Sequence, residues 1–183
     1  MSSTSQRETV DDLARHDGKA ELIGGRVVAL MPTGVRPNEI AGNIYVSLRL
    51  FAQQSGQGRV FTDNIGYTVP ELDSGRESFS PDASWYEGPL PANAMRFIEG
   101  PPTFAVEVRS ENDYGSSAER ELEAKRIDYF AAGTLVVWDV DPIAETVAIY
   151  LRDGGSRVVA RGEVADAEPA VPGWQIDVDE IVA

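Results

Sequence analysis

The stretch Phe104-Ala105-Val106-Glu107-Val108-Arg109-Ser110 alternates apolar side chains with Glu107 and Arg109. Alternate side chains of a β-strand point to opposite faces of a sheet, so this pattern predicts a strand with one apolar face. A strand this apolar is expected near the middle of a sheet, where a charge is costly unless it is paired or binds a metal. Glu107 is therefore the first candidate for a functional residue.

A helix and a second apolar strand follow this strand. Ser116-Ser-Ala-Glu119 has the pattern of a capping box that opens a helix, and Gly133 marks its end. Residues 134–140 form a continuous apolar run that is typical of a buried strand. A strand, a helix and a strand with short links form a right-handed crossover, so the two strands are predicted to be parallel neighbours.

A hairpin and a long helix are predicted near the N-terminus. Gly24-Gly25 has the composition of a two-residue turn, which predicts a hairpin over residues 21–31. Apolar side chains recur at helical spacing over residues 38–55, so this segment is predicted to be a helix. Asn38 is the expected N-cap, and Gly56 is the expected C-terminal stop.

Further strands are predicted on both sides of the crossover unit. Residues 59–70 favour a kinked strand, and residues 79–86 favour a short one. Pro81 lacks an N–H group, so pairing of the second strand is expected to begin at or after Asp82. Residues 146–160 have the pattern of a hairpin.

The length of 183 residues and the 42% apolar share indicate one globular domain. We predict that residues 1–19 form an N-terminal arm with a short helix and that residues 20–183 form the domain. The N-terminus lacks the apolar core of a secretory signal, and no apolar run approaches the length of a membrane span. The expected localisation is cytoplasmic.

Residue types exclude several kinds of site. The absence of cysteine excludes disulfides, thiolate zinc sites and cysteine nucleophiles. The single histidine, His16, excludes a histidine metal cluster and argues against a Ser-His-Asp triad. Any metal would need oxygen ligands, which favour magnesium, manganese or calcium. The net charge of −14 argues against a broad nucleic-acid surface.

Three charged residues form the candidate catalytic set. Asp82 stands at the head of a strand, Glu107 lies within the central strand, and Lys125 lies on the helix stripe predicted to face the sheet. Two carboxylates can hold a divalent cation, and an ammonium group can orient water and offset charge in a transition state. The set predicts metal-dependent phosphodiester hydrolysis, with Arg109 and Ser110 as candidate phosphate contacts or braces of the site.

These residues resemble a known family. Pro81-Asp82, the strand 104–110, Lys125 with Tyr129, and Val137-Trp-Asp-Val-Asp141-Pro142 together resemble the Uma2 family of restriction endonucleases, within the PD-(D/E)XK nuclease superfamily. The opening Glu21-Leu-Ile-Gly-Gly25 and the closing Val171-Pro-Gly-Trp174 are also similar to that pattern.

The resemblance has implications for fold and chemistry. It implies an α/β (α+β) restriction-endonuclease-like fold, with a mixed central sheet flanked by helices. It implies Mg²⁺ (or Mn²⁺) held by Asp82 and Glu107, with Lys125 as the catalytic lysine on the helix and Glu21 lining the same site. The histidine that the family often carries early in the first long helix, near residues 36–38, is absent here.

The leading hypothesis is a metal-dependent DNA endonuclease, with a homodimer as one option because nucleases that cut both strands often act as dimers. Two alternatives stay open. The acidic charge and the missing histidine favour an inactive binding or scaffold protein with the nuclease fold. A hydrolase of small phosphoesters would tolerate the net charge of −14 better than long DNA would. The three tryptophans, Trp85, Trp138 and Trp174, are predicted to pack in the core.

Overall fold

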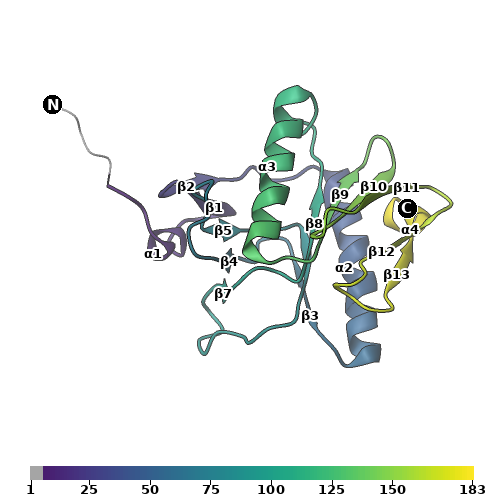
Figure 1. The fold of residues 1–183 in the computed structure, drawn as a ribbon, viewed down its shortest axis with the longest axis horizontal. Helices are drawn as coiled ribbons and strands as arrows, with labels where there is room; N and C mark the ends of the chain where they lie inside the picture. The colour runs from purple at the N-terminus through teal and green to yellow at the C-terminus, as the bar shows by residue number, and fades with distance from the viewer. Residues whose placement is uncertain (1–5) are drawn as a thin grey trace.

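The computed structural model describes residues 6–183 (Figure 1), so the first five residues of the predicted N-terminal arm lie outside this range. The helices are α1 (Val10–Leu13), α2 (Val35–Ser55), α3 (Ser116–Ala132) and α4 (Val178–Ile181). The strands are β1 (Ala20–Ile23), β2 (Arg26–Ala29), β3 (Arg59–Thr62), β4 (Tyr67–Thr68), β5 (Ser78–Phe79), β6 (Ala83–Tyr86), β7 (Ile98–Glu99), β8 (Phe104–Val108), β9 (Val136–Asp141), β10 (Thr146–Leu151), β11 (Ser156–Ala160), β12 (Val164–Asp166) and β13 (Gln175–Asp177).

The main sheet has six strands in the order β11-β10-β9-β8-β6-β3. Strands β8 and β9 are parallel, and every other neighbouring pair is antiparallel. The sheet is therefore mixed, and the predicted crossover through α3 is confirmed. Strand β8 lies in the interior of the sheet, as its apolar pattern predicts. Smaller sheets are formed by β1 with β2, by β12 with β13, and by β5, β4 and β7.

Helices α2 and α3 lie on opposite sides of this sheet (Figure 1). Alternation along β8 explains how both sides are filled. Phe104, Val106 and Val108 face the larger core with α2, whereas Ala105 belongs to a second core that includes Tyr129 of α3. Because side chains alternate along a strand, Glu107 points to the α3 side of the sheet.

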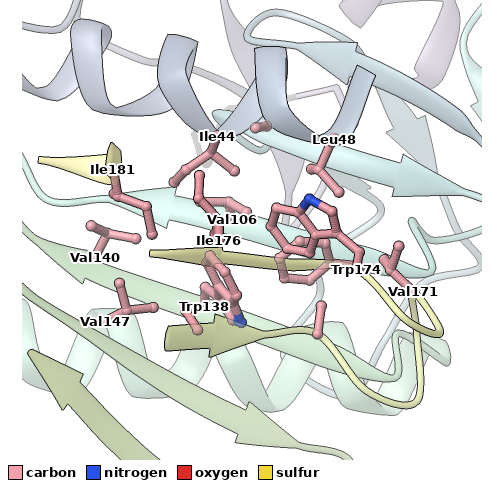
Figure 2. Packing of buried hydrophobic residues seen from close by; sticks show 14 of the residues in the cluster. Ile44, Leu48, Val106, Trp138, Val140, Val147, Val171, Trp174, Ile176 and Ile181 are labelled. Atoms are coloured by element: carbon pink, nitrogen blue, oxygen red, sulfur yellow. The ribbon is translucent and has the colours of Figure 1, made fainter. Parts of the chain in front are cut away.

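The larger core is built around aromatic contacts. Trp138 and Trp174 stack with ring centroids 5.3 Å apart, and Phe104 meets Trp138 edge-on at 5.1 Å. Figure 2 shows Ile44 and Leu48 of α2 pointing down onto this group. All three tryptophans are buried, which confirms the prediction that they pack in the core.

Both long helices begin differently from the prediction. Helix α2 begins at Val35 with Gly34 as its N-cap, so the expected cap at Asn38 is wrong. Pro37 is compatible with the first turn of a helix because the N–H groups there have no partner in the helix. The capping box at the start of α3 is also wrong, because Gly115 is the N-cap and makes no side-chain hydrogen bond.

The strand predicted over residues 59–70 is interrupted. Strands β3 and β4 belong to different sheets, and the turn between them contains Asn64 with a φ of 70°. Asparagine is one of the few residues that adopt this left-handed conformation readily. Among the helices in residues 6–183, none is long and apolar enough to cross a membrane.

Two substitutions on α2 test the packing of this helix on the sheet. Ile44 is fully buried, so Ile44→Ala is expected to lower the free energy of unfolding by about 2–5 kcal/mol. Val46 on the same helix is 55% exposed, and Val46→Ala is expected to change it by about 0.5 kcal/mol or less. Urea unfolding measures both. Equal losses would show that α2 does not pack as described.

Candidate functional site

Asp82 and Glu107 are brought together by the pairing of β6 with β8. The N–H of Asp82 donates to the carbonyl of Val106 (3.0 Å), and the N–H of Val108 donates to Oδ2 of Asp82 (2.8 Å). The first bond ties the main chain of Asp82 to Val106, and the second ties its carboxylate to Val108. The two bonds therefore flank Glu107 on β8. Backbone pairing therefore sets where the two acids lie relative to each other.

Helix α3 supplies the cation beside Glu107. Nζ of Lys125 lies 2.9 Å from Oε2 of Glu107, and the hydroxyl of Tyr129 donates to Oε1 of the same carboxylate (2.6 Å). Lys125 and Tyr129 are one turn apart, which places both on the face that packs on the sheet. The helix stripe predicted from sequence is confirmed, and Lys125 meets an anion there.

Glu21 lies on the other side of Lys125. Its Oε1 is 3.1 Å from Nζ of Lys125 and accepts the N–H of Ser80 at 3.0 Å, and its Oε2 pairs with Arg76. The Glu21 side chain is only 3% exposed. Its oxygens are therefore occupied by protein donors, and Glu21 holds Lys125 in place.

Arg76 is a charged residue of the site that was not predicted from the sequence. Its Nε lies 2.9 Å from Oδ2 of Asp128 on α3, so one buried guanidinium joins Asp128 to Glu21. Arg76 sits in a polar loop segment between β4 and β5, and no periodic pattern there distinguishes a buried arginine from a solvated one.

Lys19 is a second ammonium group at the site that sequence analysis missed. Its Nζ lies 2.9 Å from Oδ1 of Asp82 and 2.5 Å from Oδ1 of Asp63. Burial alone would lower the pKa of Lys19, but Asp82, Glu107 and Asp63 outweigh burial and raise it above the usual value. Lys19 therefore stays protonated between two carboxylates.

The buried groups of the site shift one another's pKa values. Burial raises the pKa of Glu107; Lys125 opposes this shift, but Asp82 and Glu21 add to it, and the pKa stays above its usual value. Burial alone would lower the pKa of Lys125, but Glu107 and Glu21 outweigh it and raise that pKa. Burial would raise the pKa of Glu21, but Lys125 and Arg76 hold it below its usual value.

The site contains more negative than positive side chains. The ion pairs around the site form two separate groups: Asp63 and Asp82 share Lys19, and Glu21, Glu107 and Asp128 share Lys125 and Arg76. With all of these residues ionised, each group carries one excess negative charge, which makes two in total. A divalent cation would balance this excess.

The donor set fits a magnesium or manganese ion. Asp82 and Glu107 are each 17% exposed, against 3% for Glu21, so water reaches both carboxylates even though each of their oxygens also has a protein partner. Across residues 6–183, no three carboxylate or imidazole groups gather closely enough to hold a metal by themselves. Magnesium is commonly bound by one or two carboxylates with water as the remaining ligands, which is the arrangement available here.

Arg109 and Ser110 are engaged within the protein. Nε and a terminal nitrogen of Arg109 each lie 2.7 Å from an oxygen of Asp139, and the same guanidinium pairs with Glu119. Glu119, which is not at the third helical position because Gly115 is the N-cap, contacts Arg109. The hydroxyl of Ser110 lies 3.2 Å from that of Thr33.

A cavity of about 200 Å³ lies beside the main chain at Lys19, although Lys19, Asp63 and Asp82 are not among its lining residues. Its lining includes Gly18 and Ala20, which flank Lys19, together with Asn64, which follows Asp63. Ser80 also lines it, and its buried hydroxyl has no hydrogen-bond partner in the described part of the chain.

Known proteins resemble this chain in sequence and in fold. The sequence model of the Uma2 family, described as "Putative restriction endonuclease", matches residues 7–179. A crystal structure from Anabaena variabilis, described as a putative nuclease belonging to DUF820, is similar with a TM-score of 0.73 and 17% identity. The similarity covers 95% of this chain and 97% of that one, and it shows a shared fold. Comparison with curated proteins gave no match.

The buried role of Arg76 is testable by stability measurements. Arg76→Met would leave the Asp128 carboxylate without its cation and remove one cation from Glu21, so the free energy of unfolding is expected to fall by about 3–5 kcal/mol at neutral pH. The loss is expected to shrink only as pH falls below about 4.3, the ordinary value for glutamate, because Lys125 and Arg76 hold the pKa of Glu21 below that value and Glu21 needs its counter-charge until it is protonated.

A matched control is Arg96→Met, which breaks the exposed pair with Asp11. Exposed pairs contribute about 0–1 kcal/mol, so this variant is expected to unfold nearly like the parent. Urea unfolding at the two pH values provides the measurement. Similar losses in both variants, or a loss in Arg76→Met that grows at low pH, would contradict the buried network.

Proposed function

The chain belongs to the Uma2 family, and from this premise we propose that it is a metal-dependent nuclease that hydrolyses DNA phosphodiester bonds. The observation that carries the proposal is the meeting of Asp82, Glu107 and Lys125 at neighbouring central strands, among ion pairs that together carry two excess negative charges. Two carboxylates in a site with excess negative charge can hold a divalent cation. A fixed ammonium group beside them can stabilise the negative charge that develops on a phosphate as it is hydrolysed.

Each residue of the set has a proposed role. Asp82 and Glu107 would hold Mg²⁺ or Mn²⁺, which when bound lowers the pKa of its water and polarises a phosphate oxygen. Lys125 stays protonated because its pKa is raised, so it acts as a hydrogen-bond donor and a positive charge and does not accept a proton from water. Tyr129 fixes the Glu107 carboxylate, and Glu21 fixes Lys125.

For Arg109 we favour the bracing role over a phosphate contact. Its guanidinium is held by both oxygens of Asp139 and by Glu119, so it ties the ends of β8 and β9 to α3. A phosphate would have to compete with two carboxylates for the same donors. Ser110 follows β8 and stays a predicted phosphate contact.

A small-phosphoester hydrolase is the second candidate, and the net charge of −14 favours it. Long DNA is repelled by the acidic surface of the whole protein, whereas a small phosphoester interacts only with the charges close to the site. DNA binding by phosphate contacts would weaken with added salt, because such contacts release counterions. The predicted homodimer belongs to the DNA hypothesis, since nucleases that cut both strands often act as dimers.

Three substitutions test the catalytic set. Asp82→Asn, Glu107→Gln and Lys125→Met are each expected to reduce Mg²⁺- or Mn²⁺-dependent cleavage of plasmid DNA by roughly 100-fold or more. Plasmid nicking followed on gels gives the rates, and a parallel assay uses bis(p-nitrophenyl) phosphate as a small diester. Glu123→Gln, which neutralises an exposed carboxylate on the same helix, is expected to leave the rate unchanged.

The two assays separate the candidates. Hydrolysis of the small diester without cleavage of DNA would favour the second candidate. A folded protein that binds Mn²⁺ and cleaves neither substrate would favour a scaffold protein with the nuclease fold. Equal activity of Lys125→Met and its parent would remove Lys125 from the mechanism.

A further inference from the structure

Lys19 occupies the position from which a cation would approach Asp82. One oxygen of Asp82 accepts the N–H of Val108, and the other lies 2.9 Å from Nζ of Lys19. Both oxygens of this carboxylate are therefore engaged in the protein. A divalent cation reaches Oδ1 only by competing with an ammonium group that already neutralises it.

Asp63 offers this ammonium group an alternative partner. Its Oδ1 lies 2.5 Å from Nζ of Lys19, and its side chain is 37% exposed, compared with 17% for Asp82. Lys19 therefore bridges an inner and an outer carboxylate. If the contact with Asp82 is lost, the ammonium keeps a partner that lies closer to solvent.

The surroundings allow this exchange by a side-chain movement alone. The carbonyl of Lys19 accepts the N–H of Leu30 (2.9 Å), so the backbone is fixed where β1 begins. The Lys19 side chain is 18% exposed and already touches both carboxylates. A long, flexible lysine side chain can therefore release one of them and keep the other without a shift of the main chain.

We propose that Lys19 is a built-in competitor of the divalent cation: without metal it bridges Asp82 and Asp63, and when the metal binds it releases Asp82 and keeps Asp63 alone. This inference rests on the proposed metal site at Asp82 and Glu107, and it adds a switch to that site. It makes metal affinity depend on two residues that are not metal ligands. Lys19 weakens binding of the metal, and Asp63 restores part of that binding.

Calorimetric titration of the chelator-treated protein with Mn²⁺ tests the proposal. Lys19→Gln removes the competitor and is expected to tighten Mn²⁺ binding roughly tenfold, whereas Lys19→Arg keeps the charge and is expected not to tighten it. Asp63→Asn removes the alternative partner and is expected to weaken Mn²⁺ binding, by roughly threefold to tenfold.

The double variant separates a switch from a simple change in local charge. With Lys19 already replaced by Gln, Asp63→Asn is expected to have little effect on Mn²⁺ affinity, because no ammonium group remains to be received. If Asp63→Asn weakens binding equally in both backgrounds, Asp63 acts through its charge alone and the proposal is wrong. Unchanged or weaker Mn²⁺ binding in Lys19→Gln would also overturn it.

Failure of the metal site gives a different pattern. Asp82→Asn is the reference variant and is expected to abolish binding in every background. If neither the parent nor Lys19→Gln binds Mn²⁺, the metal site and the switch are both wrong. If Mn²⁺ binds with the expected order of affinities while DNA is not cleaved, the nuclease proposal fails and the switch stands. Binding by Lys19→Gln alone would be its strongest support.

Discussion

A carboxylate on the inner strand of a sheet is the constraint from which the rest of this structure follows. Glu107 points from β8 toward α3, into the layer that also holds the apolar and aromatic residues of the second core. An ionised group in such a place is stable only when it is compensated nearby. Lys125 and Tyr129 provide that compensation, and they in turn fix how α3 lies on the sheet.

The compensation spreads outward as a chain of shared charges. Lys125 is shared between Glu107 and Glu21, and Arg76 is shared between Glu21 and Asp128. Each cation thus serves two acids that come from different segments of the chain. The hairpin β1–β2, the loop before β5 and helix α3 are joined through these pairs, so the candidate site and the fold have the same supports.

Regular elements made much of this arrangement predictable. The period-two pattern of residues 104–110 placed Glu107 on the face opposite the larger core, and the stripe with Lys125 and Tyr129 placed the ammonium group against the sheet. The partners Lys19 and Arg76 lie outside regular elements, where no periodicity reveals a side chain's direction. The capping box failed because the helix begins one residue earlier than the pattern requires, with Gly115 as N-cap, and Glu119 pairs with Arg109.

The reciprocal bonds between Asp82 and β8 have a consequence for how this protein can change. The spacing of the two acids is set by main-chain register, and sliding one strand by a single residue would turn Glu107 to the opposite side. Insertions in the long connection over residues 87–103 leave that register intact, whereas one inside either strand would dismantle the acid pair. Insertions and deletions are therefore compatible with the Asp82–Glu107 pair only outside the paired strands β6 and β8.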